Sequence, residues 1–184
     1  MDQKKFRETL GLFSTGVIIA CARRRNFLAE KIFDHKIFNE TNLGKNLLAK
    51  LKKIFAAEFF GMTINSFSSL SLEPKQILFC IDNKSTNLRL FKKNRYFSLN
   101  VLSQEQLELA KAFALTKNSK KWDAEPYSFG KFGNPIFENS LGFFECKKHH
   151  VIKSGDHHII IGEVLDFGKI NESKPLVFYR GGFL

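Results

Sequence analysis

Two clusters of polar side chains in the sequence suit the two ends of a nucleotide-like ligand. Residues 61–74 carry five side-chain hydroxyl groups and one amide, within a predicted strand and the turn after it. Such groups can hydrogen-bond a planar heterocycle, and they are equally at home in a plain serine-rich turn. Residues 82–86 follow the next predicted strand and open a short helix, where backbone N–H groups favour an anion. The two clusters together indicate a ring at the first and a phosphate at the second, beside Lys84.

The histidine and cysteine residues give weaker indications of a functional site. Two histidine pairs flank a predicted hairpin turn, and His149 and His158 are expected to share a face of the sheet. No carboxylate or cysteine joins them at a metal-ligand spacing, so no metal site is expected. Cys21, Cys80 and Cys146 form no CxxC pair and have no obvious activating neighbour. The sequence also contains no glycine-rich dinucleotide fingerprint, phosphate loop or nucleophile elbow.

Strands predominate among the elements that must position these groups. Apolar spacing predicts a helix over residues 2–13, followed by a buried strand over 17–22 that is rich in β-branched residues. Ser103 and Gln106 form a capping box for a helix that runs to about residue 115. Residues 116–140 are polar and turn-rich, and are predicted to be a long loop. Further strands are predicted at 62–66, 77–82, 96–102, 141–152, 157–167 and 176–179, with a short helix at 87–93. This mainly β pattern favours a closed antiparallel barrel.

Composition restricts the class of protein. The chain has 184 residues, 43% of them hydrophobic, which fits a single domain. Its net charge of +11 suggests a polyanionic partner, but the excess is mostly scattered lysine with few arginines, so no nucleic-acid function is expected. No apolar run is long enough for a membrane span or for a signal-peptide core, and a cytoplasmic location is expected.

Residues 23–60 differ from the rest of the chain. They hold nine basic and four acidic residues, so 9 − 4 = +5 of the net charge lies there. A helix is predicted from about residue 43 to 55, with leucines on one side and lysines on the other. Such a helix could bind a membrane surface or a partner. Alternatively, its lysines simply solvate the outer side of a helix packed on the core, and this second interpretation is favoured.

Several ordered motifs resemble the flavin reductase-like family. Residues 61–74 are similar to its G-M-T-x-N-S-F-x-S-x-S-L-x-P motif, and residues 155–164 to its G-D-H-x-I-x-x-G-x-V motif. Residues 6–17 resemble its opening helix and first strand, residues 97–102 its F-x-x-N-V-L strand, and residues 175–183 its closing strand. The resemblance covers almost everything outside residues 23–60. It implies the FMN-binding split β-barrel, an antiparallel Greek-key fold, formed by one domain over residues 1–184 with residues 23–60 as an insertion.

The resemblance also implies cofactors and their site. The family binds FMN, with FAD possible, and uses NADH or NADPH; its members are typically homodimers that supply a monooxygenase or another electron acceptor. His157 would lie near the nicotinamide or flavin face, unless it only hydrogen-bonds its own turn. Thr63, Asn65 and Ser66 would face the flavin ring, and Asn100 would border it from the other side. The full set of implied cofactor-binding residues is Thr63, Ile64, Asn65, Ser66, Ser69, Ser71, Cys80, Ile81, Asp82, Lys84, Ser85, Thr86 and Asn100.

The implied reaction is hydride transfer from NAD(P)H to the flavin. Positioning of the two rings carries most of such catalysis, which agrees with the lack of a nucleophile or carboxylate pair. Two departures from the family pattern stand out: the insertion at 23–60, and Glu73-Pro74-Lys75 in place of the usual D-P-P turn. Two alternatives stay open, a flavin-bound electron carrier without enzymatic activity and a basic module that binds through residues 23–55.

Overall fold

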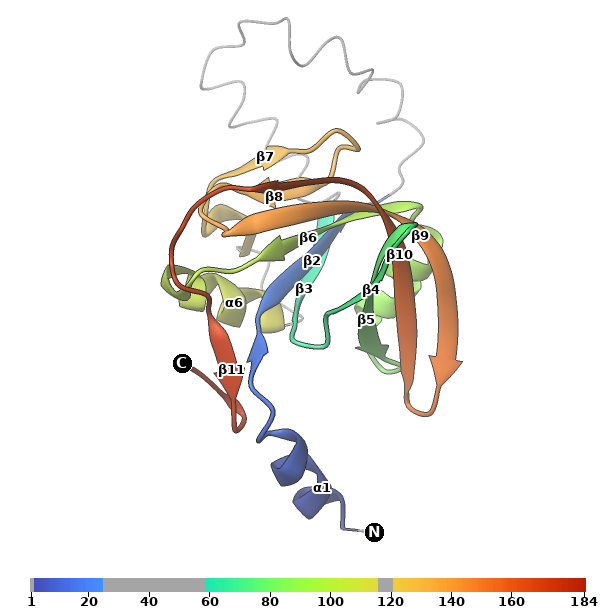
Figure 1. Cartoon of the computed structure of the whole chain (residues 1–184), viewed down its shortest axis with the longest axis vertical. Helices are drawn as coiled ribbons and strands as arrows, with labels where there is room; N and C mark the ends of the chain where they lie inside the picture. Colours follow the sequence, from blue (N-terminus) through green and yellow to red (C-terminus); the bar gives the residue numbers. More distant parts are fainter. Residues whose placement is uncertain (1, 25–58, 116–120) are drawn as a thin grey trace, which may run out of the picture.

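One large antiparallel sheet organises the chain (Figure 1). The structure is a computed structural model that describes residues 2–24, 59–115 and 121–184. The large sheet has the strand order β3-β2-β6-β9-β10-β5-β4, with bounds β3 (Phe59–Ile64), β2 (Ile18–Arg23), β6 (Tyr96–Val101), β9 (Gly142–Ser154), β10 (His157–Lys169), β5 (Lys75–Asp82) and β4 (Ser68–Leu72). Two smaller sheets are β1 (Thr15–Gly16) with β11 (Val177–Tyr179) and β12 (Gly182–Phe183), and β7 (Tyr127–Phe129) with β8 (Pro135–Phe137). The helix predicted at 43–55 lies outside the described residues.

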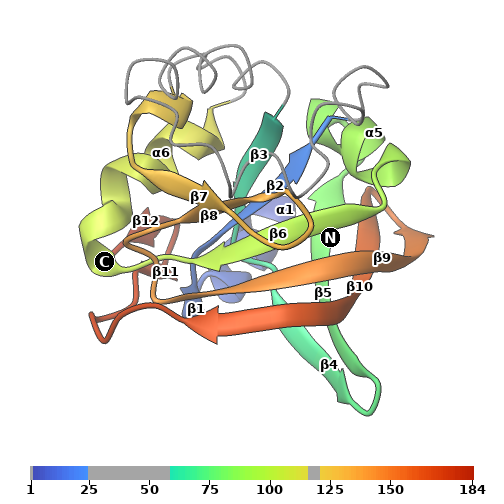
Figure 2. The same ribbon diagram turned by 90° about the horizontal axis from the view of Figure 1, so that it is seen from above.

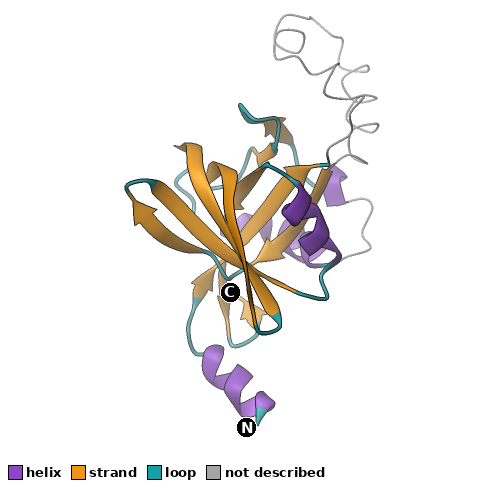
Figure 3. Ribbon diagram, turned by 90° about the vertical axis from the view of Figure 1, so that its right-hand side faces the viewer, coloured by secondary structure: helices purple, strands orange, loops and turns teal. Residues whose placement is uncertain are grey.

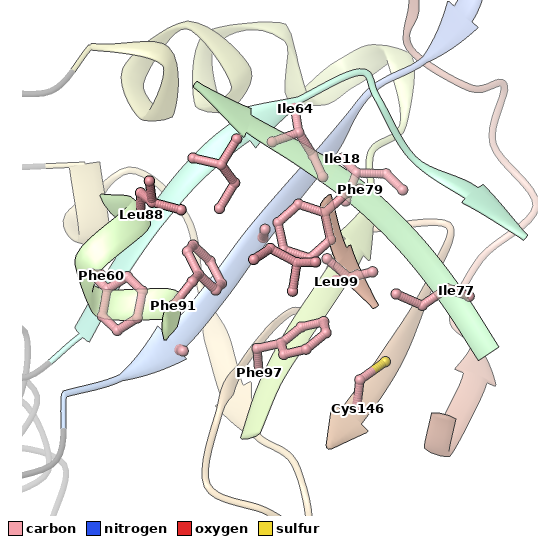
Figure 4. Packing of buried hydrophobic residues seen from close by; sticks show 14 residues of the cluster. Ile18, Phe60, Ile64, Ile77, Phe79, Leu88, Phe91, Phe97, Leu99 and Cys146 are labelled. Atoms are coloured by element: carbon pink, nitrogen blue, oxygen red, sulfur yellow. The ribbon is translucent and has the colours of Figure 1, made fainter. Parts of the chain in front are cut away.

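Strand β2 is buried on both of its faces, which explains its unbroken apolar run. Ile18 and Ala20 point into the interior of the barrel, where they pack with Phe79 and Phe97 (Figure 4). The alternate residues of β2 point outward into a second core. The strand therefore separates two apolar layers, and a polar residue at any position from 18 to 22 would be buried away from solvent.

The second core lies under a layer of short elements. These are the helix α6 (Leu107–Ala114), the 3-10 helix η2 (Lys121–Asp123), and the β7–β8 hairpin, which runs across β6 (Figure 2). Phe113 meets Trp122 edge-on with ring centroids 4.8 Å apart, and Phe137 at 5.5 Å. Edge-to-face aromatic packing of this kind adds to the stability that burial alone supplies. The many phenylalanines therefore fill two cores rather than one.

The two edge strands of the large sheet, β3 and β4, follow each other directly in the chain. The sheet therefore curls, so that a short link can join its two edges. A short link after β3 leads into β4, and Phe67 in that link stacks on Phe144 of β9 with ring centroids 5.8 Å apart. The helix α5 (Thr86–Lys93) packs Leu88 and Phe91 against the same interior core. These contacts give the mainly β, antiparallel split-barrel architecture expected from the sequence.

Two local predictions are wrong. Residues 116–140 are not one long loop, because η2 and the β7–β8 hairpin form within them. Residues 68–72 form the edge strand β4 rather than a serine-rich turn. In each case long-range pairing, which local composition does not encode, decides the outcome.

The helix α1 (Gln3–Leu10) stands away from the barrel (Figure 3). Asp2 caps it by accepting hydrogen bonds from the backbone N–H groups of Lys4 and Lys5, and none of its residues is buried. It ends where Gly11 accepts a hydrogen bond from the backbone of Arg180, in the turn between β11 and β12. Among the described residues, no helix is long and apolar enough to cross a membrane.

A buried carboxylate attaches the β7–β8 hairpin to the large sheet. Glu145 on β9 is 0% exposed, and its oxygens accept hydrogen bonds from the backbone N–H of Phe132 and from the side chain of Asn134. Burial raises the pKa of Glu145 above its ordinary value, and these donors oppose that shift. Gly130 leaves room for the carboxylate, since a Cβ at this glycine would lie 2.3 Å from the carboxylate carbon.

We expect Gly130→Ala to destabilise the fold by about 1–3 kcal/mol, because the added methyl group overlaps a buried carboxylate that has no space to move into. Gly16→Ala is the matched control, since nothing lies within 4 Å of the position of its Cβ. Urea unfolding followed by tryptophan fluorescence measures both variants. Equal stability of the two variants would contradict the proposed attachment.

Candidate functional site

Three segments that are distant in the sequence meet at the C-terminal end of β5. They are the link after β3, the turn between β5 and α5, and the turn between β9 and β10. The two turns are bonded to each other: the backbone N–H of Asn83 donates to the carbonyl of Asp156 at 2.9 Å, and its side-chain amide donates to the carbonyl of Gly155 at 3.2 Å. Strand pairing also places His157 opposite Asp82. The two polar clusters of the sequence therefore lie beside the hairpin histidines.

Ser66 joins the link after β3 to β5. Its hydroxyl accepts a hydrogen bond from the backbone N–H of Cys80 at 2.9 Å and donates to the carbonyl of the same residue at 3.1 Å. The serine side chain thus replaces the neighbouring strand at a point where β4 no longer pairs with β5. This arrangement holds the adjacent Asn65, which is exposed, beside the end of β5.

The turn after β5 has the features of an anion site. Asp82 accepts a hydrogen bond from the backbone N–H of Lys84 at 2.7 Å, which sets the shape of the turn. Ser85 then caps α5 by accepting from the backbone N–H of Asn87 at 3.3 Å. The helix therefore begins at Thr86 with its positive end facing the site, and the exposed Lys84 adds a full charge.

His157 is oriented by its neighbour in the turn. Its Nδ1 lies 2.7 Å from a carboxylate oxygen of Asp156, and its side chain is 45% exposed. Hydrogen bonding with His157 lowers the pKa of Asp156, so this carboxylate is ionised at neutral pH and favours a proton on Nδ1. Nε2 is then the ring nitrogen that remains for a ligand.

His158 faces a different environment. Its Nδ1 lies 2.7 Å from the side-chain oxygen of Asn83, on the side of β10 that faces the barrel interior and α5. The pKa of His158 is lowered, first by desolvation and then by repulsion from Lys92 and Lys153. The two adjacent histidines therefore differ in role, and only His157 is placed beside Asp82 on the outer face.

The structure contradicts the predicted role of Asn100, and it shows that the hydroxyl of Thr63 already has a hydrogen-bond partner within the protein. Asn100 is completely buried on β6, where it donates to the carbonyl of Pro135 at 3.3 Å and accepts from the backbone N–H of Phe137 at 3.0 Å. It binds β8 rather than bordering a ring, because no ligand can reach a side chain with 0% exposure. The hydroxyl of Thr63 donates to the carbonyl of Ala110 on α6 at 2.6 Å, so this group is already used within the protein.

The remaining predicted residues differ in how they could contribute. Ile64 and Ile81 bury their side chains in the core, so only their backbone groups are available. Ser71 pairs with Gln76, four residues along β5 from Cys80, which is about 13 Å at the usual strand rise. Ser69 likewise lies on the β4–β5 hairpin, opposite Ile77. These two serines stand apart from the end of β5 where the other groups meet.

Cys80 and two residues outside the predicted set complete the site. Desolvation raises the pKa of the Cys80 thiol, so it is not a reactive thiolate. Asn83 and Asp156 were not predicted as site residues, yet they join the two turns and orient both histidines. Their positions directly beside Lys84 and His157 were the available signal, but the bonds between them depend on the tertiary fold.

The family model of the flavin reductase like domain matches residues 11–184. The chain belongs to this flavin reductase-like family. A flavin reductase of Pseudomonas putida is 37% identical over 123 residues, covering 67% of this chain and 72% of the relative. The FMN reductase (NADH) SmoA of Agrobacterium fabrum is 30% identical over 182 residues, covering 99% of this chain and 85% of the relative.

Solved structures agree with this assignment. Nitrilotriacetate monooxygenase component B from Mycobacterium thermoresistibile superposes with a TM-score of 0.77 at 28% identity, covering 100% of this chain and 86% of that one. The flavin reductase PheA2 gives a TM-score of 0.73 at 28% identity, covering 100% and 97%. The split-barrel fold is therefore confirmed, and the chain is a flavin reductase, an oxidoreductase that acts on flavin.

We expect Ser66→Ala to destabilise the protein by about 1–3 kcal/mol, because it leaves the N–H and C=O of Cys80 without their hydrogen-bond partner. Ser69→Ala is the control, since this serine is exposed on the edge strand. Urea unfolding of both variants measures the difference. If the two substitutions cost the same, Ser66 does not join the link to β5.

Proposed function

We propose that this flavin reductase transfers a hydride from NADH or NADPH to FMN or FAD at the end of β5. The observation that carries the proposal is the meeting of the link after β3, the capped start of α5 and the Asp156–His157 pair at one place. The FMN reductase (NADH) among its relatives and a solved relative, the flavin reductase HpaC complexed with NADP+, support this choice of cofactors.

The groups present at this site fit a flavin. A flavin phosphate needs cationic and N–H donors, and Lys84 with the start of α5 supplies both. The ring needs hydrogen-bonding groups of both kinds, and the exposed amide of Asn65 supplies a donor and an acceptor close to β5. The exposed backbone near Cys80 and Asp82 would border the ring. When bound, the flavin supplies the acceptor for the hydride.

The residues of the chain orient the reactants rather than react. Asp156 holds the imidazole of His157, and Nε2 is directed away from that carboxylate, where it can bond a carboxamide or the flavin. Because Ser66 fixes the link to β5, Asn65 and His157 are held on one rigid sheet. Geometry of this kind accounts for most of the rate in a transfer that needs no side-chain nucleophile.

The reduced flavin is proposed to serve a separate monooxygenase. Relatives include the reductase subunit HsaB of a flavin-dependent monooxygenase from Rhodococcus jostii, 28% identical over 183 residues. A diffusing product suits a site formed at the surface of one sheet end. A flavin-bound electron carrier without enzymatic activity is the rival, and steady-state oxidation of NAD(P)H separates the two.

A homodimer is proposed as the assembled form. The helix α1 exposes Phe6 and Leu10 on one side, and Phe13 directly after it is 78% exposed. Leu184, at the C-terminus, is a further exposed apolar residue. Apolar side chains exposed so fully on an otherwise charged helix are typical of a surface that a partner covers.

We expect His157→Ala to slow flavin reduction by about tenfold while leaving flavin affinity nearly unchanged, because it removes a positioning group and no flavin anchor. Asn65→Ala should do the opposite and weaken flavin binding. Anaerobic stopped-flow reduction by NADH, together with flavin fluorescence titration, measures both quantities. His150→Ala, on the same hairpin, is the control. An unaltered rate in His157→Ala would refute the role of this histidine.

We expect Phe13→Glu to convert a dimer into a monomer, because a charge replaces an exposed ring at the proposed contact. Ile170→Glu, which changes a partly exposed residue of the β10–β11 connection, should leave the dimer intact. Light scattering coupled to size-exclusion chromatography reports the mass. A wild-type protein that elutes as a monomer would overturn the proposal.

A further inference from the structure

A pocket with two arginines in its lining lies between α1 and the turn that joins β11 to β12. Its volume is about 440 Å³, which is within the range of small-ligand sites. The pocket is lined by Arg7, Glu8, Gly11, Leu12, Arg180 and Gly181. None of these residues belongs to the site at the end of β5, so the pocket is a separate feature of the fold.

The two walls of the pocket are fixed to each other. The backbone N–H of Arg180 donates to the carbonyl of Gly11 at 2.9 Å, and a Cβ at Gly11 would lie 3.4 Å from the Cα of Arg180. The end of α1 and the tip of the β11–β12 hairpin therefore approach closely. This contact holds Arg7, one helical turn before Gly11, on the same side of α1 as the hairpin tip.

The backbone of Arg180 points to a role for its side chain. Arg180 has φ +49° and Gly181 has φ +81°, and Arg180 is the single non-glycine residue with positive φ in the described ranges. Hairpin turns with two positive φ values favour Asn-Gly or Gly-Gly, because a longer side chain disfavours this conformation. An arginine at the first position is therefore unfavourable for the turn, and such exceptions concentrate at ligand sites.

The charges in the pocket suit a phosphate. In the described part of the chain, the guanidinium groups of Arg7 and Arg180 form no ion pair with a carboxylate, and Arg180 stacks over the ring of Tyr179 at 5.2 Å. A guanidinium group can bind two phosphate oxygens at once through two parallel hydrogen bonds. Glu8 is the acidic residue of the lining, and a carboxylate beside a phosphate site can accept hydrogen bonds from the hydroxyl groups of a ribose.

We propose that this pocket binds the diphosphate and ribose of a nucleotide, with Arg7 and Arg180 on the phosphates and Glu8 on the ribose. The proposed dimer contact does not occupy it, because Phe6 and Leu10 lie on a different side of α1 from Arg7 and Gly11. The ligand chemistry is common to NADH and to free nucleoside diphosphates. FAD does not qualify, because its diphosphate includes the flavin phosphate that is assigned to Lys84 and the start of α5. FMN, with one phosphate and no ribose, is excluded as its natural occupant.

Calorimetric titration of the full chain with ADP tests the proposal. We expect saturable binding of ADP, weaker binding of pyrophosphate, and no binding of adenosine, because the phosphates carry the interaction. Arg7→Gln and Arg180→Gln should each weaken ADP binding by about tenfold or more. Arg89→Gln on α5 is the matched control. Replacing Arg180 could also alter the β11–β12 turn, in which this residue has a positive φ. Arg7 is an exposed residue of α1, so Arg7→Gln tests the pocket without changing that turn.

Two further measurements separate this pocket from the flavin site. ADP should still bind when the protein is saturated with FMN, and Lys84→Ala should leave ADP affinity unchanged. Equal ADP affinity in wild type and Arg7→Gln, competition between ADP and FMN, or no ADP binding would each overturn the proposal. In Arg7→Gln, a raised KM for NADH identifies NADH as the source of the diphosphate. A loss confined to ADP identifies a free nucleotide.

Discussion

Burial of β2 on both faces is the constraint on which the rest of the structure depends. Its even-numbered residues, such as Ile18 and Ala20, fill the barrel interior, while Ile19 and Cys21 fill the outer core. A strand with two apolar faces must lie in the middle of a sheet and be covered on both sides. The outer cover is supplied by α6, η2 and the β7–β8 hairpin, and Asn100 and Glu145 bind that cover to the sheet through buried hydrogen bonds.

The proposed flavin site lies at the end of β5, outside the elements that form this cover. Strands β5 and β10 carry their polar groups to one end, where the turns at Asn83 and Asp156 are bonded to each other. Ser66 closes the remaining gap by bonding to both backbone groups of Cys80. These hydrogen bonds fix the three segments to one another, which suits a reaction governed by geometry.

The first and last segments of the chain are bonded to each other, apart from the proposed flavin site. α1 contributes no buried residue to the barrel, yet its last turn is bonded to the β11–β12 hairpin through Gly11 and Arg180. One side of this helix presents apolar side chains and another presents Arg7 and Glu8 to a pocket. A helix that adds nothing to the core of its own chain is explained by what it contacts outside that core.

Patterns within short segments were enough to predict the strand class and the long hairpin at residues 142–169, because turn residues and alternating apolar positions act locally. The ordered family motifs predicted the flavin, and the family assignment agrees with them. Only the tertiary structure decided which face each residue occupies. It buried Asn100 under β8, directed Thr63 to α6 and separated His157 from His158, because a period-two strand assigns sides that depend on pairing partners far away in the chain. The pocket at Arg7 and Arg180 likewise required the two ends of the chain to meet, a contact between residues 11 and 180 that no local pattern encodes.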